Sequence, residues 1–263
     1  MFLTNSKGIS LWKFQNFSTQ DKIQHFVSGK DGGISLAELA GLNLGFSVGD
    51  IDQHVKENRS LLAGSLDIKP DQLFFVSQYH SDKVLIVSEK YDGNPSKADA
   101  LVTNVKGICI CVMGADCVPL LAYDAKKQVV AAIHAGWRGT ASSITLKTLQ
   151  TMADNFGSQP EDIILSVGPS ISQEKYEVGE DVYQSFLELQ GDGSKKYFKH
   201  NKITDKYFPD LWEANKDQGL NFGLKENNIE VAGICTFSNP DKFYSARYFK
   251  NKTGRFAAGI MLK

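Results

Sequence analysis

Three short apolar runs, separated from one another by only a few residues, constrain the fold of this chain most strongly. They cover residues 107–113, 118–123 and 129–133 and consist mainly of Val, Ile, Leu, Ala and Cys. Runs of this length suit β-strands, and their lack of apolar–polar alternation predicts burial on both faces. Because the turns between them are short, we expect the three runs to form neighbouring strands of one sheet.

Helical patterns alternate with further strand-like runs along the rest of the chain. A helix is predicted from Thr140 or Ser142 to about Asn155, with Gly157 as its stop signal. Apolar spacing predicts two more helices, over residues 179–190 and 209–220. Strands are expected at residues 84–87, 163–167, 229–234 and 253–262, and a mobile loop at residues 191–194. No linker divides the chain, so residues 1–263 are predicted to form a single α+β domain, with mixed sheets and helices packed outside them.

The charge pattern argues against a polymeric partner. The chain has 29 basic and 30 acidic residues and a formal net charge of −1, with no block of like charge. Such a balance does not favour nucleic acid or an anionic membrane surface, so we expect a small-molecule partner and no obligate protein partner. No uncharged apolar run approaches the roughly 20 residues that span a bilayer, and the first residues show no signal-peptide pattern.

Cysteine usage predicts a reducing compartment, and therefore the cytoplasm. Four cysteines are few for 263 residues. Cys109 and Cys111 would face the same side of a strand, where a disulfide is strained, so they are interpreted as core-filling residues. Cys235 is interpreted as a strand residue without chemistry. Three histidines, His25, His54 and His200, lack matching partners in the sequence and are interpreted as surface or locally hydrogen-bonded residues.

His80, Cys117 and His134 are the strongest candidates for chemistry, because each lies at the end of a strand-like segment. One thiolate and two imidazoles form a three-ligand set for zinc, which leaves a fourth position open, as in catalytic rather than structural zinc sites. The spacing does not resemble that of a zinc finger. On these residues alone, a metal-free nucleophile pair of Cys117 and His134 stays open as the main alternative.

Basic residues near predicted turns are candidates for binding an anion. Arg138 lies at the start of the predicted helix, where backbone N–H groups and the guanidinium would suit phosphate, although it could also be an exposed arginine beside a packed Trp137. Arg59 could lie on an ordinary helix surface. Lys30 belongs to a turn, residues 30–33, that could close on a ligand.

Several motifs in the chain resemble a known family. The two most specific are Ala115-Asp-Cys-Val-Pro-Leu-Leu121 and His134-Ala-Gly-Trp-Arg-Gly-Thr140. Others follow in the family's order over nearly the whole chain: Gly32-Gly-Ile-Ser35, Leu42-Asn-Leu-Gly45, Val48-Gly-Asp50, Glu57-Asn-Arg59, Gln78-Tyr-His80, Asp99-Ala-Leu-Val-Thr103, Gly168-Pro-Ser-Ile171, Tyr176-Glu-Val-Gly179, Asp210-Leu-Trp212, Cys235-Thr236 and Thr253-Gly-Arg255. On these residues the chain is similar to the laccase-domain family of multicopper polyphenol oxidases, also called YfiH-like, which includes a peptidoglycan editing factor branch.

The resemblance implies a single α+β domain of layered mixed β-sheets flanked by helices, in the order α/β/β/α. It also implies a zinc ion bound by His80, Cys117 and His134, with copper as a possible occupant. The implied activity is purine nucleoside phosphorylase, acting on adenosine, inosine and methylthioadenosine with phosphate, and adenosine deamination as a side activity. Two departures affect phosphate binding: Lys30 replaces an arginine, and residues 243–248 lack one of two paired arginines.

Phosphorolysis requires a held phosphate, and our hypothesis assigns its charge to Arg59 and Arg138, with Arg247 or Lys30 as further contributors. Asp99 and Asp116 are candidates to orient a metal-bound imidazole. Three alternatives remain: a hydrolase of peptidoglycan precursors with Cys117 as nucleophile and His134 as base, a non-catalytic nucleoside-binding module, and a copper oxidase. The copper oxidase is disfavoured, because only five histidines are present and none forms a His-x-His pair.

Overall fold

Two six-stranded sheets, packed face to face, form the centre of the computed structural model, which describes residues 1–88 and 96–263. In spatial order, the strands of the first sheet are β1 (Phe2–Ser6), β2 (Ile9–Lys13), β3 (Ile23–Ser28), β14 (Phe256–Leu262), β7 (Cys109–Gly114) and β4 (Leu73–Phe75). Those of the second are β13 (Ile229–Val231), β10 (Ile163–Val167), β8 (Val118–Asp124), β9 (Val129–Ala135), β6 (Ala100–Thr103) and β5 (Val84–Ile86). Both sheets are mixed, because β4–β7, β5–β6 and β10–β13 are parallel pairs and the other ladders are antiparallel.

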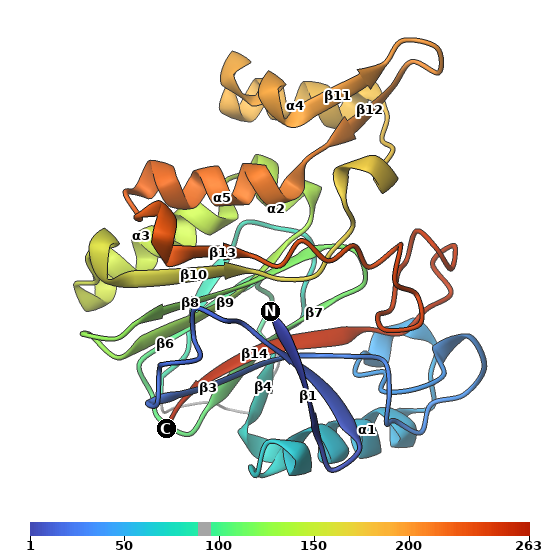
Figure 1. The fold of residues 1–263 in the computed structure, drawn as a ribbon, viewed down its shortest axis with the longest axis vertical. Helices are drawn as coiled ribbons and strands as arrows, with labels where there is room; N and C mark the ends of the chain where they lie inside the picture. The colour runs from blue at the N-terminus through green and yellow to red at the C-terminus, as the bar shows by residue number, and fades with distance from the viewer. Residues whose placement is uncertain (89–95) are drawn as a thin grey trace.

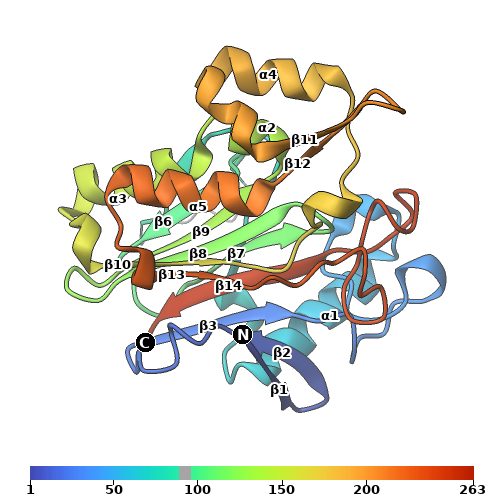
Figure 2. The ribbon, with the colours of Figure 1, turned by 45° about the horizontal axis from the view of Figure 1, so that its top comes forward.

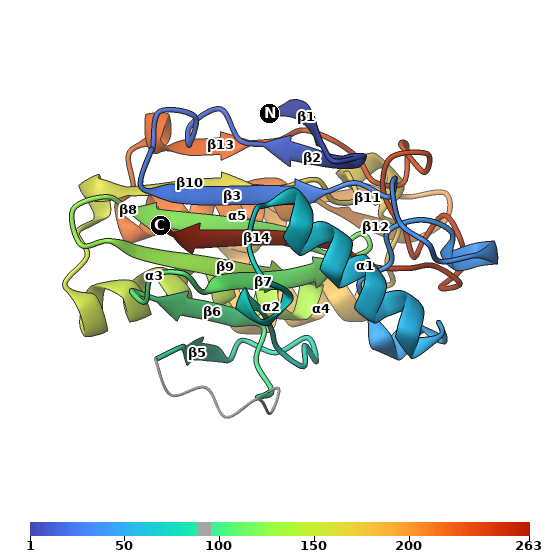
Figure 3. The same ribbon diagram turned by 90° about the horizontal axis from the view of Figure 1, so that it is seen from below.

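Helices cover the outer face of each sheet (Figures 1 and 2). Seen from below, one helix, α1 (Asp52–Ser65), crosses the first sheet (Figure 3). On the second sheet lie α2 (Trp137–Ala141), α3 (Ile144–Phe156) and α5 (Leu211–Phe222), and beyond them α4 (Glu180–Gln190) with the hairpin of β11 (Phe198–Asn201) and β12 (Lys206–Pro209). The layered α+β architecture implied by the resemblance is confirmed.

Short 3-10 helices complete the described part of the chain. They are Ala37–Leu39, Phe46–Val48, Pro70–Gln72, Pro160–Asp162, Gln173–Lys175, Asp192–Tyr197 and Glu226–Asn228. The loop predicted to be mobile at residues 191–194 instead enters the helix Asp192–Tyr197, where the Ser194 hydroxyl is buried and donates to the Gly191 carbonyl. A Gly-Asp-Gly-Ser segment suits such a hydrogen-bonded turn as well as a loose loop, and the mobility of these residues stays a prediction.

Apolar side chains fill three layers of core. Val27, Ile110 and Ile260 of the first sheet meet Leu121 and Tyr123 of the second between the sheets. A second layer lies between the second sheet and helices α3 and α5, and a third beneath α1. Because the second sheet is covered on both sides, every residue of β8 and β9 is buried, as their continuous apolar sequence predicted.

Two details of the predicted elements were wrong. Strands β8 and β9 are neighbours, but β7, the run at 107–113, belongs to the other sheet, between β14 and β4. A short connection can carry the chain between packed sheets as readily as it closes a hairpin, so length alone did not distinguish the two. The second is the start of the predicted helix: α3 ends at Gly157 as predicted but begins at Ile144, and Thr140 belongs to the separate short helix α2. Ser143, in a left-handed conformation with φ of 61°, separates the two helices.

Candidate metal centre

His80, Cys117 and His134 lie together at one edge of the second sheet. Their ligand atoms are all within 4.8 Å of one another, and the Cys117 Sγ is 3.8 Å from the His80 Nε2. The two imidazole rings are inclined at 73°, with centroids 5.1 Å apart. His134 is buried, Cys117 half-buried and His80 exposed, so the cluster is open on the side of His80. The structure thus brings together the three residues that the sequence singled out.

Strand register explains this meeting. Pro119 of β8 lies opposite His134 of β9, and Cys117 lies two residues before Pro119, where the chain enters the second sheet from the first. On the other side of β9, Ala100 pairs with Ile133, which places Asp99 next to His134, and the Asp99 carbonyl accepts the His134 N–H at 2.7 Å. Cys117, His134 and Asp99 therefore converge at the ends of three neighbouring strands, β8, β9 and β6.

Asp99 organises both histidines. Its Oδ1 lies 2.9 Å from the His134 Nδ1 and accepts the backbone N–H of His80 at 3.0 Å. Its Oδ2 accepts the backbone N–H and the hydroxyl of Ser81, both at 2.7 Å, and the N–H of Tyr79 at 3.3 Å. Burial raises the pKa of this carboxyl group, but the hydrogen bonds from His134 and Ser81 outweigh it and lower the pKa to about 2.

The thiol and the buried imidazole stabilise each other's charged forms. Burial alone would raise the pKa of Cys117, but the neighbouring imidazoles of His134 and His80 lower it overall. Burial alone would lower the pKa of His134, yet the adjacent Cys117 and Asp99 raise it. A thiolate is the form of cysteine that binds metal or attacks an electrophile, so this environment prepares Cys117 for either role.

The donor set could hold a metal ion, and one of its ligand separations suits zinc. Ideal tetrahedral coordination by one thiolate and one imidazole separates their ligand atoms by about 3.6 Å, which is close to the Cys117–His80 distance of 3.8 Å. Because the Nδ1 of His134 is engaged by Asp99, its Nε2 is the atom left to face a metal. Gly136 keeps this space clear, since a Cβ there would lie 3.0 Å from the His80 Cδ2 and 3.1 Å from the Cys117 Sγ.

Cationic and phenolic groups lie within electrostatic range of Cys117. Burial and the nearby Cys117 and Asp116 raise the pKa of Tyr176, while Arg247 and Arg138 oppose this shift, so these charges share one neighbourhood. The Arg247 guanidinium lies 5.2 Å from the centre of the Tyr176 ring and donates to the Glu177 carbonyl at 2.8 Å. Arg138 is exposed and lies over Trp137, 4.2 Å from the ring centre. Arg247 and Arg138 therefore act on the same phenol as Cys117, and their assignment to phosphate stays a prediction.

The other two predicted phosphate-binding residues make aromatic contacts. The Arg59 guanidinium lies 4.0 Å from the ring centre of Phe75 and 4.6 Å from that of Phe46, and donates to the Leu44 carbonyl. The Lys30 ammonium lies 4.9 Å from the ring centre of Phe249 and 5.6 Å from that of Tyr244. Their assignment to phosphate stays a prediction.

Sequence reasoning assigned no role to Tyr176 or Arg255. Burial lowers the pKa of Arg255, and the charges of Cys117 and Asp116 counteract this shift. Tyr176 and Arg255 each lie within a family motif, and this was the only signal that could have identified them. Asp99 contacts His134 as predicted, whereas the carboxylate of Asp116 instead accepts hydrogen bonds from Thr236 and the backbone of Arg247.

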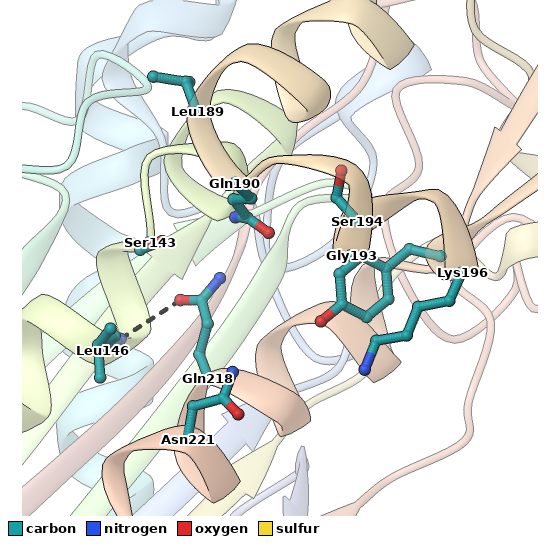
Figure 4. A pocket seen from close by; sticks show the side chains of 10 residues that line it. Ser143, Leu146, Leu189, Gln190, Gly193, Ser194, Lys196, Gln218 and Asn221 are labelled. Atoms are coloured by element: carbon teal, nitrogen blue, oxygen red, sulfur yellow. Dashed lines mark hydrogen bonds between the residues drawn. The ribbon is translucent and has the colours of Figure 1, made fainter.

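A polar network from α4 and α5 anchors helix α2, which follows His134. Gln190 of α4 and Gln218 of α5 both donate to the Thr140 carbonyl, at 2.7 and 2.9 Å. The Gln218 carbonyl accepts the N–H of Thr145. It also accepts the N–H of Leu146, as Figure 4 shows. A hollow of about 300 Å³ beside these side chains is lined by none of the three metal ligands. The network fixes the segment that carries Arg138.

In the part of the chain that the structure describes, the helices are too short or too polar for any of them to cross a membrane.

Comparison with known proteins supports the assignment of the whole chain to one family. Residues 24–263 match the family model described as multi-copper polyphenol oxidoreductase laccase. A protein of Bacteroides thetaiotaomicron named purine nucleoside phosphorylase is 38% identical over 257 residues, which is 95% of each chain. A protein of an unknown prokaryotic organism, named adenosine deaminase RL5, is 34% identical and aligns over 85% of this chain and 88% of its own.

The fold is also shared with solved structures. The crystal structure of YlmD from Geobacillus stearothermophilus superimposes with a TM-score of 0.92 at 28% sequence identity, and the match covers 100% of this chain and 98% of that one. Sequence motifs, fold and family model agree over nearly the full length. The chain belongs to the multi-copper polyphenol oxidoreductase laccase family.

Proposed function

We propose that the protein is a zinc-dependent purine nucleoside phosphorylase that acts on adenosine, inosine and methylthioadenosine, with adenosine deamination as a side activity. The observation that carries this proposal is the three-ligand set of His80, Cys117 and His134, open to solvent at His80, with Arg138 and Arg247 nearby. The names of the relatives, purine nucleoside phosphorylase and adenosine deaminase, support the same pair of reactions.

The protein's own residues account for positioning and charge. Phosphorolysis joins phosphate to C1′ of the ribose as the bond to the purine breaks, so the protein must hold an anion beside the sugar and stabilise the departing base. Arg138 and Arg247 would hold phosphate, and the half-buried ring of Tyr176 would contact the uncharged part of the nucleoside. Zinc, when bound, supplies a Lewis acid that activates water for attack on the adenine ring in deamination.

Free cysteines fit a reducing cytoplasm, which is part of this proposal. Cys109, Cys111, Cys117 and Cys235 are all unpaired. In an oxidising compartment, disulfide formation would compete with metal binding for the thiolate of Cys117.

The test is incubation of the purified protein with adenosine and phosphate, followed by mass spectrometry of the products beside the Cys117→Ala variant. Adenine and ribose 1-phosphate, formed by the native protein and absent with the variant, support the phosphorylase. Inosine as the sole product would replace it with a deaminase. Absence of product from zinc-containing protein would reject both.

A second function is favoured by one observation, the chain of contacts from Asp99 through His134 to Cys117. This arrangement also suits a metal-free hydrolase with Cys117 as nucleophile, His134 as base and Asp99 as its orienting group. A nucleophilic thiolate must be free, whereas a ligand is masked by its metal. Alkylation of Cys117 by iodoacetamide in freshly purified protein, before and after chelation, separates the two: protection that chelation removes indicates a ligand.

A further inference from the structure

The carboxylate of Asp116 joins the metal-ligand segment to the loop that carries Arg247. Its Oδ1 accepts the hydroxyl of Thr236 at 2.7 Å, and its Oδ2 accepts the backbone N–H of Arg247 at 2.7 Å. Thr236 and Asp116 are both buried. The two donors lie at opposite ends of residues 236–247, so a single carboxylate closes this loop beside Cys117.

Arg247 is held at both of its ends. Asp116 fixes its backbone, and the carbonyl of Glu177 accepts one N–H of its guanidinium at 2.8 Å. A guanidinium has five N–H donors, so further N–H groups of Arg247 can donate to an oxyanion. Asp116 directly precedes Cys117 in the chain. The hydrogen bond from the Arg247 backbone to Asp116 therefore also fixes Arg247 relative to the candidate metal ligand Cys117.

The backbone of Asp116 has a separate role. Its φ is 90°, in the left-handed region, and its carbonyl accepts the N–H of Ile171 at 3.0 Å. Glycine would satisfy this turn with less strain. A turn alone therefore does not explain an aspartate here, whereas the two hydrogen-bond donors from the 236–247 loop do.

We infer that Asp116 is a positioning residue, which places Arg247 to bind the phosphate of the proposed phosphorolysis. This inference rests on the proposed function. In this account, Asp116 positions the arginine of the anion site, and Asp99 positions the metal ligands.

The test compares Asp116→Gly with the native, zinc-containing protein by calorimetric titration with inorganic phosphate. Glycine keeps the turn and removes the carboxylate, and Asp116→Asn provides a second variant that retains one acceptor. Asp67→Gly is the matched control, since Asp67 also has a positive φ, of 56°, but lies exposed in a distant turn. We expect the Kd for phosphate to rise about tenfold in Asp116→Gly, with zinc content and the KM for adenosine in deamination unchanged.

A double-mutant cycle with Arg247→Ala shows whether Asp116 acts through that arginine. The proposal predicts that Asp116→Gly weakens phosphate binding no further when Arg247 is absent. Additive losses, or a native Kd in both Asp116 variants, would overturn the inference while phosphorolysis by the native protein stands. Phosphate binding without turnover by the native protein would reject the proposed function alone, and the cycle would still decide the role of Asp116. A native protein that does not bind phosphate would overturn both.

Discussion

The carboxylate of Asp99 contacts the ring of His134 at 2.9 Å, with both side chains buried. The same oxygen accepts the backbone N–H of His80, so one aspartate sets the positions of two candidate metal ligands that lie 54 residues apart in the sequence. Carboxylates that orient a ligating imidazole tune metal affinity strongly, although they never touch the metal. Asp99 therefore has the largest expected effect on the site among residues outside the ligand set.

Replacing Asp99 by Asn should weaken zinc binding by about ten- to a hundredfold, because the imidazole of His134 loses its anionic partner. Competition against a chromophoric chelator measures this affinity. Asp82→Asn is the matched control. Asp82 follows His80 by two residues in the sequence, but its carboxylate pairs with Lys147 at the surface. Equal affinities in the native protein and Asp99→Asn would contradict the assigned role.

Adding one methyl group at Gly136 should disturb the metal site without removing a ligand. The Cβ of an alanine would approach the Cys117 Sγ and the His80 ring to 3.1 and 3.0 Å, closer than ordinary van der Waals contact. We expect lower zinc occupancy, measured by elemental mass spectrometry. Gly64→Ala in α1 is the control: a Cβ there meets nothing within 4 Å, and the change should raise the free energy of unfolding by about 0.5–1 kcal/mol. Full zinc occupancy in Gly136→Ala would show that the space is not needed.

His25 should make stability depend on pH. Burial and the nearby Lys13 charge lower the pKa of His25 from its ordinary value of 6.5 to about 3, and its Nε2 accepts the Phe14 N–H at 2.9 Å. Between these pH values the unfolded chain binds a proton that the folded protein excludes. The free energy of unfolding should therefore fall as pH drops from about 6.5 toward 3, by up to about 1.4 kcal/mol per pH unit from this group.

Urea unfolding of His25→Gln beside the native protein measures that contribution, because glutamine can accept the same hydrogen bond and does not titrate. The decline of the native protein should be steeper than that of the variant. His200→Gln is the control, since His200 pairs with Asp205 near the surface. Parallel pH profiles for the native protein and His25→Gln would contradict the assignment.

Much of the fold followed from apolar patterning. The burial of β8 and β9 on both faces is written in their uninterrupted apolar sequence, and Cys109 and Cys111 are core residues as predicted. The location of β7 in the opposite sheet was missed, because periodicity reports burial but not which strand is the partner. His25 is buried, although the sequence offered no sign of a partner, since its hydrogen bond comes from a backbone N–H.

The candidate ligands could be found from the sequence because each lies at a strand end within a specific motif. Tyr176 and Arg255 also lie within family motifs, but their electrostatic coupling to Cys117 could not be foreseen, because it depends on segments that meet only in the folded protein. Asp116 was a candidate to orient an imidazole, but its contact with Arg247, which lies 131 residues away, could not be foreseen. Hydrogen bonds of such long sequence separation leave no periodic signature in the sequence.

The most direct test of the account is to follow phosphorolysis while zinc is removed and restored in one preparation. Ribose 1-phosphate formation from adenosine and phosphate should fall in proportion to the zinc taken up by a chelator, and should recover when zinc is added back. The Cys117→Ala variant should stay inactive throughout. Ribose 1-phosphate formation that persists in zinc-free protein would contradict the role of the metal centre in phosphorolysis.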